Sequence, residues 1–155
     1  MKTFRYAVQS LALLFLIVSV FLGCPARAMA EEAGRENRTL KDWLDQGALL
    51  SAYGNYDAAI EHYRKALELD PDSAEALFQL GVCYGELRRY DDAVAAMTMA
   101  IDRKPESGSY YYGRGRVHLI SGNREKAMND FMEAGVLGDP DARQFLVSES
   151  GVNWQ

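Results

Sequence analysis

The sequence predicts an all-α protein made of three successive helix pairs, and two observations support this fold. Small residues, aromatic residues and prolines recur at a spacing of 34 residues along much of the chain. Each unit also contains two stretches whose apolar residues follow the period of an α-helix, with glycine or arginine between them. Because one helix pair cannot bury its apolar side alone, the repeated pairs are expected to stack into an α-solenoid.

The first 30 residues are expected to form a secretory signal peptide. Lys2 and Arg5 precede an apolar run over residues 11–22, and an Ala-Met-Ala sequence ending at Ala30 offers a cleavage site. The apolar run is shorter than the roughly 20 residues that cross a bilayer. Cleavage after Ala30 would leave residues 31–39 as a polar linker and would place the protein in the periplasm or outside the cell.

A second processing route is open at residues 21–24, Phe-Leu-Gly-Cys. They resemble the lipobox of bacterial lipoproteins, in which the cysteine is lipidated and becomes the first residue. Phe21 and Leu22 depart from the leucine and the small residue that this motif usually has. Lipidation of Cys24 would produce a membrane-anchored lipoprotein facing the periplasm, and a retained signal segment would also anchor the chain. Membrane association is expected only by these two routes.

Charge and cysteine content narrow the possible partners and the sources of stability. Removal of residues 1–30 lowers the number of basic residues from 17 to 14 and leaves 22 acidic ones, for a net charge of about −8. Nucleic acid is therefore not an expected partner, since no run of Lys and Arg forms a basic stripe. Cleavage after Ala30 also removes Cys24, so Cys83 remains alone and no intramolecular disulfide can form. Stability is expected to come from packing.

The three repeats are expected at residues 40–73, 74–107 and 108–141. Five columns of residues recur among them at the same offset: Trp43, Leu77 and Tyr111; Gly47, Gly81 and Gly115; Ala59, Ala93 and Ala127; Tyr63, Met97 and Phe131; and Ala66, Ala100 and Ala134. The first two columns lie four residues apart and therefore share one face of the first helix. The glycine on that face is expected to be a socket that lets the second helix approach closely.

Glycines and prolines indicate where these helices end. Gly54 and Gly122 lie where the first helix of a pair must reverse, a position that suits positive φ, and Arg88 has the equivalent place in the second repeat. Pro71 and Pro105 are expected to close the second helices of the first two repeats.

The third repeat is expected to have the softest first helix and to be followed by a cap. Gly113 and Gly115 lie in that helix, where each costs roughly 1 kcal/mol relative to alanine. The repeat closes with proline at Pro140, one place later than the others. The segment Pro140–Ser148 has apolar residues on one side and is expected to form a short capping helix, so that residues 142–155 comprise the cap and a tail.

The columns over residues 40–141 resemble the tetratricopeptide repeat family, whose helix-turn-helix units stack into a right-handed superhelix. Gln46 and Arg114 stand where that family prefers leucine, and Leu50 and His118 stand where it prefers tyrosine. The resemblance implies a right-handed α-solenoid of three repeats with a C-terminal capping helix. It also implies a protein-interaction module, because solenoids bind partners on the surface that their first helices line.

The titratable residues do not suggest an enzyme or a metal site. His62 and His118 fall in different repeats and columns, and spacing suggests no Ser-His-Asp set or Cys-His pair. Cys83 is expected to be a small buried residue, and the methionines have the spacing of a helix interior. Residues 113–116, Gly-Arg-Gly-Arg, lie within an expected helix and so lack the free backbone donors of a phosphate loop. No cofactor is expected.

The family resemblance assigns six candidate residues to a partner-binding groove. They are Leu44, Phe78, Val82, Tyr112, Arg116 and Leu119. This set is largely apolar with two aromatic rings, so the expected partner is a protein or peptide with large apolar or aromatic anchors, and Arg116 could hold a carboxylate. Some members of the family hold acidic chaperone tails with a clamp of lysine, arginine and asparagine side chains. This clamp is not expected here, because Leu44 and Ala48 are among the residues at the matching positions. The chain's own tail or a second copy remain alternative occupants.

These observations predict an exported protein-interaction module that acts as a scaffold or assembly factor of the bacterial cell envelope. An alternative is a structural subunit of an envelope complex that is anchored by a lipid on Cys24. A third hypothesis is a non-catalytic accessory domain of an enzyme system.

Overall fold

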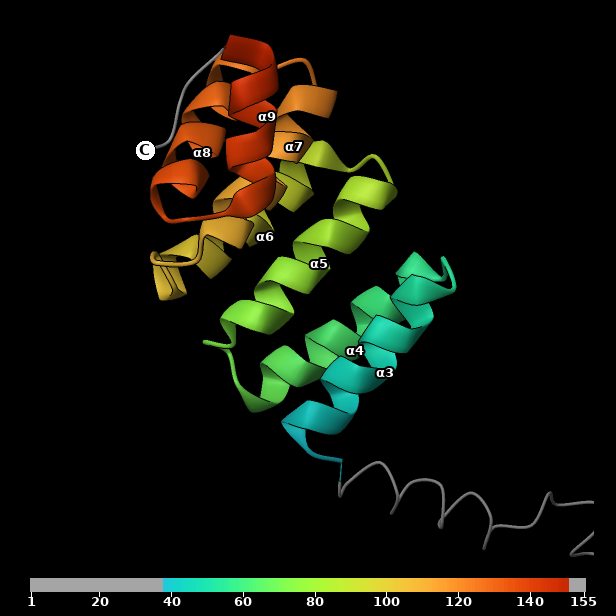
Figure 1. The fold of residues 1–155 in the computed structure, drawn as a ribbon. Coiled ribbons are helices and arrows are strands. Elements are labelled where there is room, and N and C mark those ends of the chain that lie inside the picture. Colours follow the sequence, from blue (N-terminus) through green and yellow to red (C-terminus); the bar gives the residue numbers. More distant parts are fainter. Residues whose placement is uncertain (1–37, 151–155) are drawn as a thin grey trace, which may run out of the picture. The chain divides into compact units, whose positions relative to one another are not determined.

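Helices fill the part of the chain that the computed structural model describes, residues 38–150. Seven of them follow one another over this range, and it contains no β-strand (Figure 1). The expected signal peptide, Cys24 and the tail 151–155 lie outside the described residues, as does most of the expected linker.

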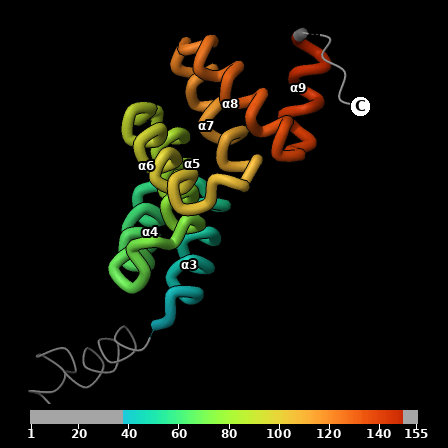
Figure 2. Tube along the Cα trace, turned by 90° about the vertical axis from the view of Figure 1, so that its left-hand side faces the viewer, coloured from blue at the N-terminus to red at the C-terminus, as the bar shows by residue number. Residues whose placement is uncertain are grey.

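Six of the helices form three pairs, and the seventh follows them. The pairs are α3 (Leu40–Ala52) with α4 (Tyr56–Leu69), α5 (Ala74–Glu86) with α6 (Tyr90–Arg103), and α7 (Gly108–Ile120) with α8 (Arg124–Val136), followed by α9 (Pro140–Ser150). Each helix contacts the next, and α5 also contacts the first helices of the neighbouring pairs (Figure 2). The first helices start 34 residues apart, as the repeat predicts, and the prediction of an all-α solenoid is confirmed.

Polar side chains fix the starts of α3 and α5. Thr39 forms a capping box with Asp42: the Thr39 hydroxyl accepts from the Asp42 N–H at 3.3 Å, and the Asp42 carboxylate accepts from the Thr39 N–H at 2.8 Å. Thr39, the last residue of the expected linker, is therefore the N-cap of α3. Ser73 similarly accepts from the Ala76 N–H at the start of α5.

The glycine column forms the close contact within each pair. A Cβ atom on Gly47 would lie 2.6 Å from the Tyr63 ring, and one on Gly115 would lie 2.8 Å from the Phe131 ring. In the middle pair a Cβ on Gly81 would lie 2.6 Å from Cγ of Met97. All three neighbouring side chains are buried. The structure therefore confirms that these glycines are sockets.

The turns inside the pairs share one conformation, which requires a residue with positive φ. Gly54 and Gly122 supply it with φ of 76° and 88°, and Arg88 supplies it in the middle pair with φ of 59°. The next N–H then bonds to the carbonyl five residues back, as between Arg89 and Tyr84 at 2.9 Å. A residue with a side chain costs roughly 1 to 2 kcal/mol in this conformation, so Arg88 strains its turn.

The connection from α8 to α9 differs from the expected end of a third repeat. Gly138, with φ of 92°, reverses the chain just as the turns inside the pairs do. Pro140 then takes the first position of α9, and Asp139 caps the helix by accepting from the Ala142 N–H at 2.8 Å. As a result α9 starts two residues before residue 142, and it runs past Ser148 to Ser150.

Two apolar clusters stabilise the helix pairs. One joins the first two pairs and reaches Val117 of α7, and the other joins α7, α8 and α9 around Phe131. Phe131 contacts Phe145 of α9 with ring centroids 4.5 Å apart, and Leu146 is fully buried beside it. The last helix therefore covers the apolar end of the third pair, as a capping helix of a solenoid must.

Within residues 38–150, no helix combines the length and the apolar character needed to cross a membrane.

Candidate functional site

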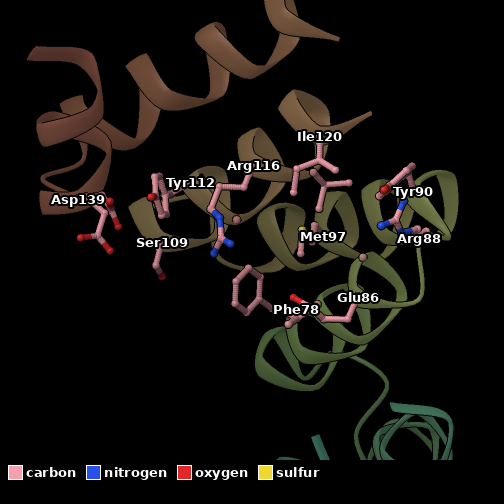
Figure 3. Close-up of a pocket in the computed structure, with 15 residues that line it drawn as sticks. Phe78, Glu86, Arg88, Tyr90, Met97, Ser109, Tyr112, Arg116, Ile120 and Asp139 are labelled. Carbon is pink, nitrogen blue, oxygen red and sulfur yellow. The ribbon is translucent and has the colours of Figure 1, made fainter. Parts of the chain in front are cut away.

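An open pocket of about 660 Å³ lies along α5 and α7 (Figure 3). Its walls come from α5 and the turn after it, from α6 and α7, and from the start of α9. Its apolar lining consists of Phe78, Val82, Met97, Tyr112, Val117 and Ile120. Such a lining with a few polar groups around it is typical of a binding pocket.

Phe78 forms part of the pocket wall and also joins α5 to α7. Its ring stacks on Tyr110 with centroids 4.6 Å apart, and a Cβ on Gly113 would lie 2.6 Å from the same ring. Gly113 therefore makes room for an aromatic ring from the neighbouring pair. The sequence predicts a softer helix at Gly113 but does not reveal this contact.

Ile120 is the most exposed apolar side chain of the pocket, with 64% of its surface accessible. It ends α7, one helical turn after Arg116, and lies on the same side of the pocket as Tyr90 (Figure 3). An exposed large apolar side chain beside a pocket is available to a partner, and it can be replaced without disturbing the core.

Charged groups surround this apolar lining. Arg116 points toward Phe78, and Arg88 lies beside Tyr90 at the start of α6 (Figure 3). Asp139 and Asp141 lie at the start of α9, and Glu86 lies at the end of α5. The pocket thus offers two cations and three carboxylates around an apolar floor.

Four of the six predicted groove residues line this pocket: Phe78, Val82, Tyr112 and Arg116. Leu44 and Leu119 are not in its wall. Leu44 packs against the core of the first two pairs, and Leu119 packs against the cluster that contains Phe131 and Leu146. The position of Leu119 could not be predicted from the family columns, because they do not show that α9 packs against that cluster.

Sequence reasoning missed Arg88 and Ile120 as pocket residues because neither lies in a column that the family uses for binding. A signal for Arg88 was present, since arginine replaces the glycine that the other pairs have at this turn. Ile120 gave no comparable signal, because an apolar residue near the end of a helix is equally typical of a core.

A buried ion pair holds the third helix pair together next to the pocket. Arg114 of α7 donates from Nε and Nη2 to the two carboxylate oxygens of Asp130 in α8, at 2.9 and 2.7 Å. Its Nη1 donates to the Thr98 hydroxyl of α6 at 3.0 Å. The hydrogen bond with Asp130 raises the pKa of Arg114. Arg114 therefore ties three helices together, which explains its departure from the leucine of the family.

The histidines lie in unrelated surroundings. His118 is buried, its Nδ1 has no hydrogen-bond partner among the described residues, and burial lowers its pKa. His62 approaches the Ala58 carbonyl with Nδ1 at 2.9 Å and packs against the Trp43 ring. The two side chains therefore form no joint site.

Cys83 is completely buried in the core, where its Sγ lies 3.8 Å from the Ser51 hydroxyl. Burial raises the pKa of its thiol, which disfavours the reactive thiolate. No group of three or more His, Cys, Asp or Glu side chains in the described part of the chain is placed to hold a metal ion.

Curated proteins with similar sequences match this chain over a small part of their own length. Mouse superkiller complex protein 3 is 31% identical over 91 residues, which are 59% of this chain and 6% of that protein. Human protein SGT1 homolog is 28% identical over 85 residues, 55% of this chain and 23% of that protein. The chain thus spans less than a quarter of the length of these relatives.

Solved structures with the same fold include the second tetratricopeptide domain of Spaghetti (RPAP3) bound to an HSP90 peptide. It has a TM-score of 0.62 and 24% identity, and the match covers 68% of this chain and 98% of that one. YrrB, described as a tetratricopeptide protein with an unusual peptide-binding site, has a TM-score of 0.67 and 23% identity, with 79% and 64% covered. These likenesses show the fold.

Two family models identify the repeats directly. One described as TPR repeat matches residues 47–88, and one described as tetratricopeptide repeat matches residues 84–143. Together they cover most of the three helix pairs. This chain therefore belongs to the tetratricopeptide repeat family.

Proposed function

We propose that this chain is a protein-interaction module that binds a partner polypeptide in the pocket between α5 and α7. The observation that carries the proposal is the apolar lining of that pocket, with Ile120 exposed at its edge and Phe78 and Tyr112 in its wall. Aromatic and large apolar side chains supply much of the binding energy in protein interfaces. The partner segment accordingly has large apolar side chains.

The similar structures support this use of the fold. The Spaghetti domain is described as bound to an HSP90 peptide, and YrrB as having a peptide-binding site. The present pocket has its own chemistry, because its two cations come from Arg88 and Arg116 around an apolar floor. The kind of partner is therefore inferred from the cations and the apolar lining of this pocket.

The N-terminal pattern supports export and a role as a scaffold or assembly factor of the bacterial cell envelope. The basic residues, the apolar run and the Ala-Met-Ala site before Glu31 carry this part of the proposal. Cys24 favours a second candidate, a lipid-anchored subunit of an envelope complex. N-terminal sequencing and the intact mass of the native protein distinguish them: a chain starting at Glu31 supports the free form, and a lipidated Cys24 supports the anchored form.

Replacement of an exposed pocket residue tests the groove. Ile120→Gln should weaken binding to partners captured by crosslinking in the native cells by about 5- to 20-fold, since it removes the burial of an apolar side chain. Met132→Gln is the matched control, because Met132 is 53% exposed on α8 and does not line the pocket. If the affinity of Ile120→Gln equals that of the control for every captured partner, the groove is not the binding surface.

A further inference from the structure

Arg88 and Arg116 differ from the other arginines that the structure describes. Every other one has a hydrogen bond, ion pair or other polar contact, as Arg64, Arg89 and Arg103 illustrate. The Arg88 and Arg116 side chains are exposed and make no such contact with the described residues, and both line the pocket. Their charges are therefore available to a bound molecule.

Arg88 also occupies a position where glycine is the favoured residue. The three equivalent turns use Gly54, Gly122 and Gly138, and a Cβ on any of them would meet nothing within 4 Å. These glycines are thus favoured for their backbone conformation and not for lack of space. Because the Arg88 side chain forms no hydrogen bond or ion pair with the described residues that would offset the strain, folding alone does not account for an arginine here.

Two of the three carboxylates around the pocket, unlike the two arginines, have a role in the fold. Asp139 accepts from the Ala142 N–H and caps α9, and Asp141 lies in the first turn of that helix, where a negative charge is favourable. Glu86 forms no ion pair with Arg88 although it lies only two residues away. The helix therefore explains two of the three carboxylates, whereas nothing in the described fold explains the two guanidinium groups.

We propose, on the basis of the function inferred above, that Arg88 and Arg116 each bind a side-chain carboxylate of the partner polypeptide. Arg116 lies within α7, one helical turn before Ile120, whereas Arg88 lies just beyond the end of α5. The apolar lining of the pocket therefore lies between the two cations (Figure 3). The partner segment thus carries two acidic residues with a large apolar or aromatic residue between them. A guanidinium can hold a carboxylate by two parallel hydrogen bonds, which gives the contact both strength and orientation.

Matched synthetic peptides test this chemistry on the full chain. Each peptide has about 12 residues, enough to follow the pocket when extended, and contains phenylalanine and leucine anchors. Three pools carry Glu, Gln or Lys at the positions that flank the anchors, and all peptides are acetylated and amidated so that only side-chain charges differ. Fluorescence anisotropy should show the Glu pool binding about 10-fold more tightly than the Gln pool, with a smaller difference at high salt.

Arg88→Gly is the decisive variant because affinity and stability should change in opposite directions. It should weaken binding of the Glu pool by about 5- to 10-fold and weaken binding of the Gln pool much less. At the same time the melting temperature should rise by about 2 to 5 °C, since glycine relieves the strained turn. Gly54→Arg is the control: it strains the equivalent turn away from the pocket, so it should lower the melting temperature without changing the affinity.

The outcomes separate this inference from the function on which it rests. Failure of all three pools to bind would contradict peptide binding by the pocket itself. Equal binding of the Glu and Gln pools, tighter binding of the Lys pool, or an Arg88→Gly variant with unchanged affinity for the Glu pool would overturn the roles of the arginines while leaving the groove as a binding surface.

Discussion

The second and third helix pairs have the same backbone plan but different interiors. Leu80 and Ala96 are buried between α5 and α6, and the residues 34 positions later are Arg114 and Asp130, which form the buried ion pair. Both pairs keep their glycine socket and their turn of positive φ. The two interiors show that the repeat spacing sets the helix geometry, whereas the interior chemistry can change from apolar to ionic if both partners change together.

The largest expected effect is the loss of one partner of the ion pair. Asp130→Ala leaves the Arg114 guanidinium buried without its carboxylate, and removing one partner of a buried pair costs about 3 to 5 kcal/mol. We expect about 3 kcal/mol, because 18% of the Arg114 side chain remains accessible to water. Urea denaturation followed by circular dichroism measures the change in the free energy of unfolding.

The control gives the third pair an apolar interior like that of the second pair. The double variant Arg114→Leu with Asp130→Ala should lie within about 1 kcal/mol of the wild type or exceed it, since well-packed apolar residues often replace a buried ion pair without loss. If Asp130→Ala alone costs less than about 1 kcal/mol, water or a rearranged Arg114 satisfies the charge, and the two interiors are less different than their contacts indicate.

A smaller effect is expected from filling a glycine socket. Gly81→Leu should lower the free energy of unfolding by about 1 to 3 kcal/mol, because even a Cβ there would lie 2.6 Å from Met97. Ala95→Leu is the control, since Ala95 is exposed on α6 and should change stability by no more than about 0.5 kcal/mol. Equal stability of the two variants would mean that α5 and α6 can separate without cost.

The sequence predicted the parts of the structure that follow from local pattern. The first helices begin at Leu40, Ala74 and Gly108, at the spacing of the repeat, and Pro71 and Pro105 precede the second and third of them. The turn at Gly138 was not predicted: the expected boundary was placed at the following Asp-Pro, which also resembles a repeat end.

The candidate site was predicted less completely, for a different physical reason. Phe78 and Arg116, which the resemblance to the repeat family assigned to the groove, line the pocket. Arg88 could be recognised as a pocket residue only once the backbone conformation of its turn was known. The position of Leu119 could be recognised only once the packing of α9 was known. The Arg114–Asp130 pair likewise depends on two side chains meeting across helices, which no single column reveals.

The smallest expected effect concerns the second substitution between the two interiors, in which Tyr84 of the second pair corresponds to His118 of the third. Burial lowers the pKa of His118, and the nearby Asp130 acts in the opposite direction with less effect. The unfolded state, with a histidine pKa of about 6.5, therefore binds more protons than the folded state just below that pH. The stability contributed by neutral His118 is present above about pH 6.5 and is lost as the pH falls through the lower pKa of the folded protein.

His118→Tyr removes this titration and makes the third interior resemble the second at that column. We expect the free energy of unfolding of the wild type to fall more than that of the variant between about pH 7.5 and about pH 5.5. The measurement is a urea titration of both proteins at each pH, so that carboxylates common to both cancel in the difference. An equal fall in both proteins would show that His118 accepts a proton without cost, which would require its Nδ1 to find a partner in the protonated state. In that case the polar cluster around Arg114 and Asp130 would adapt to charge, a property that the apolar interior of the second pair does not share.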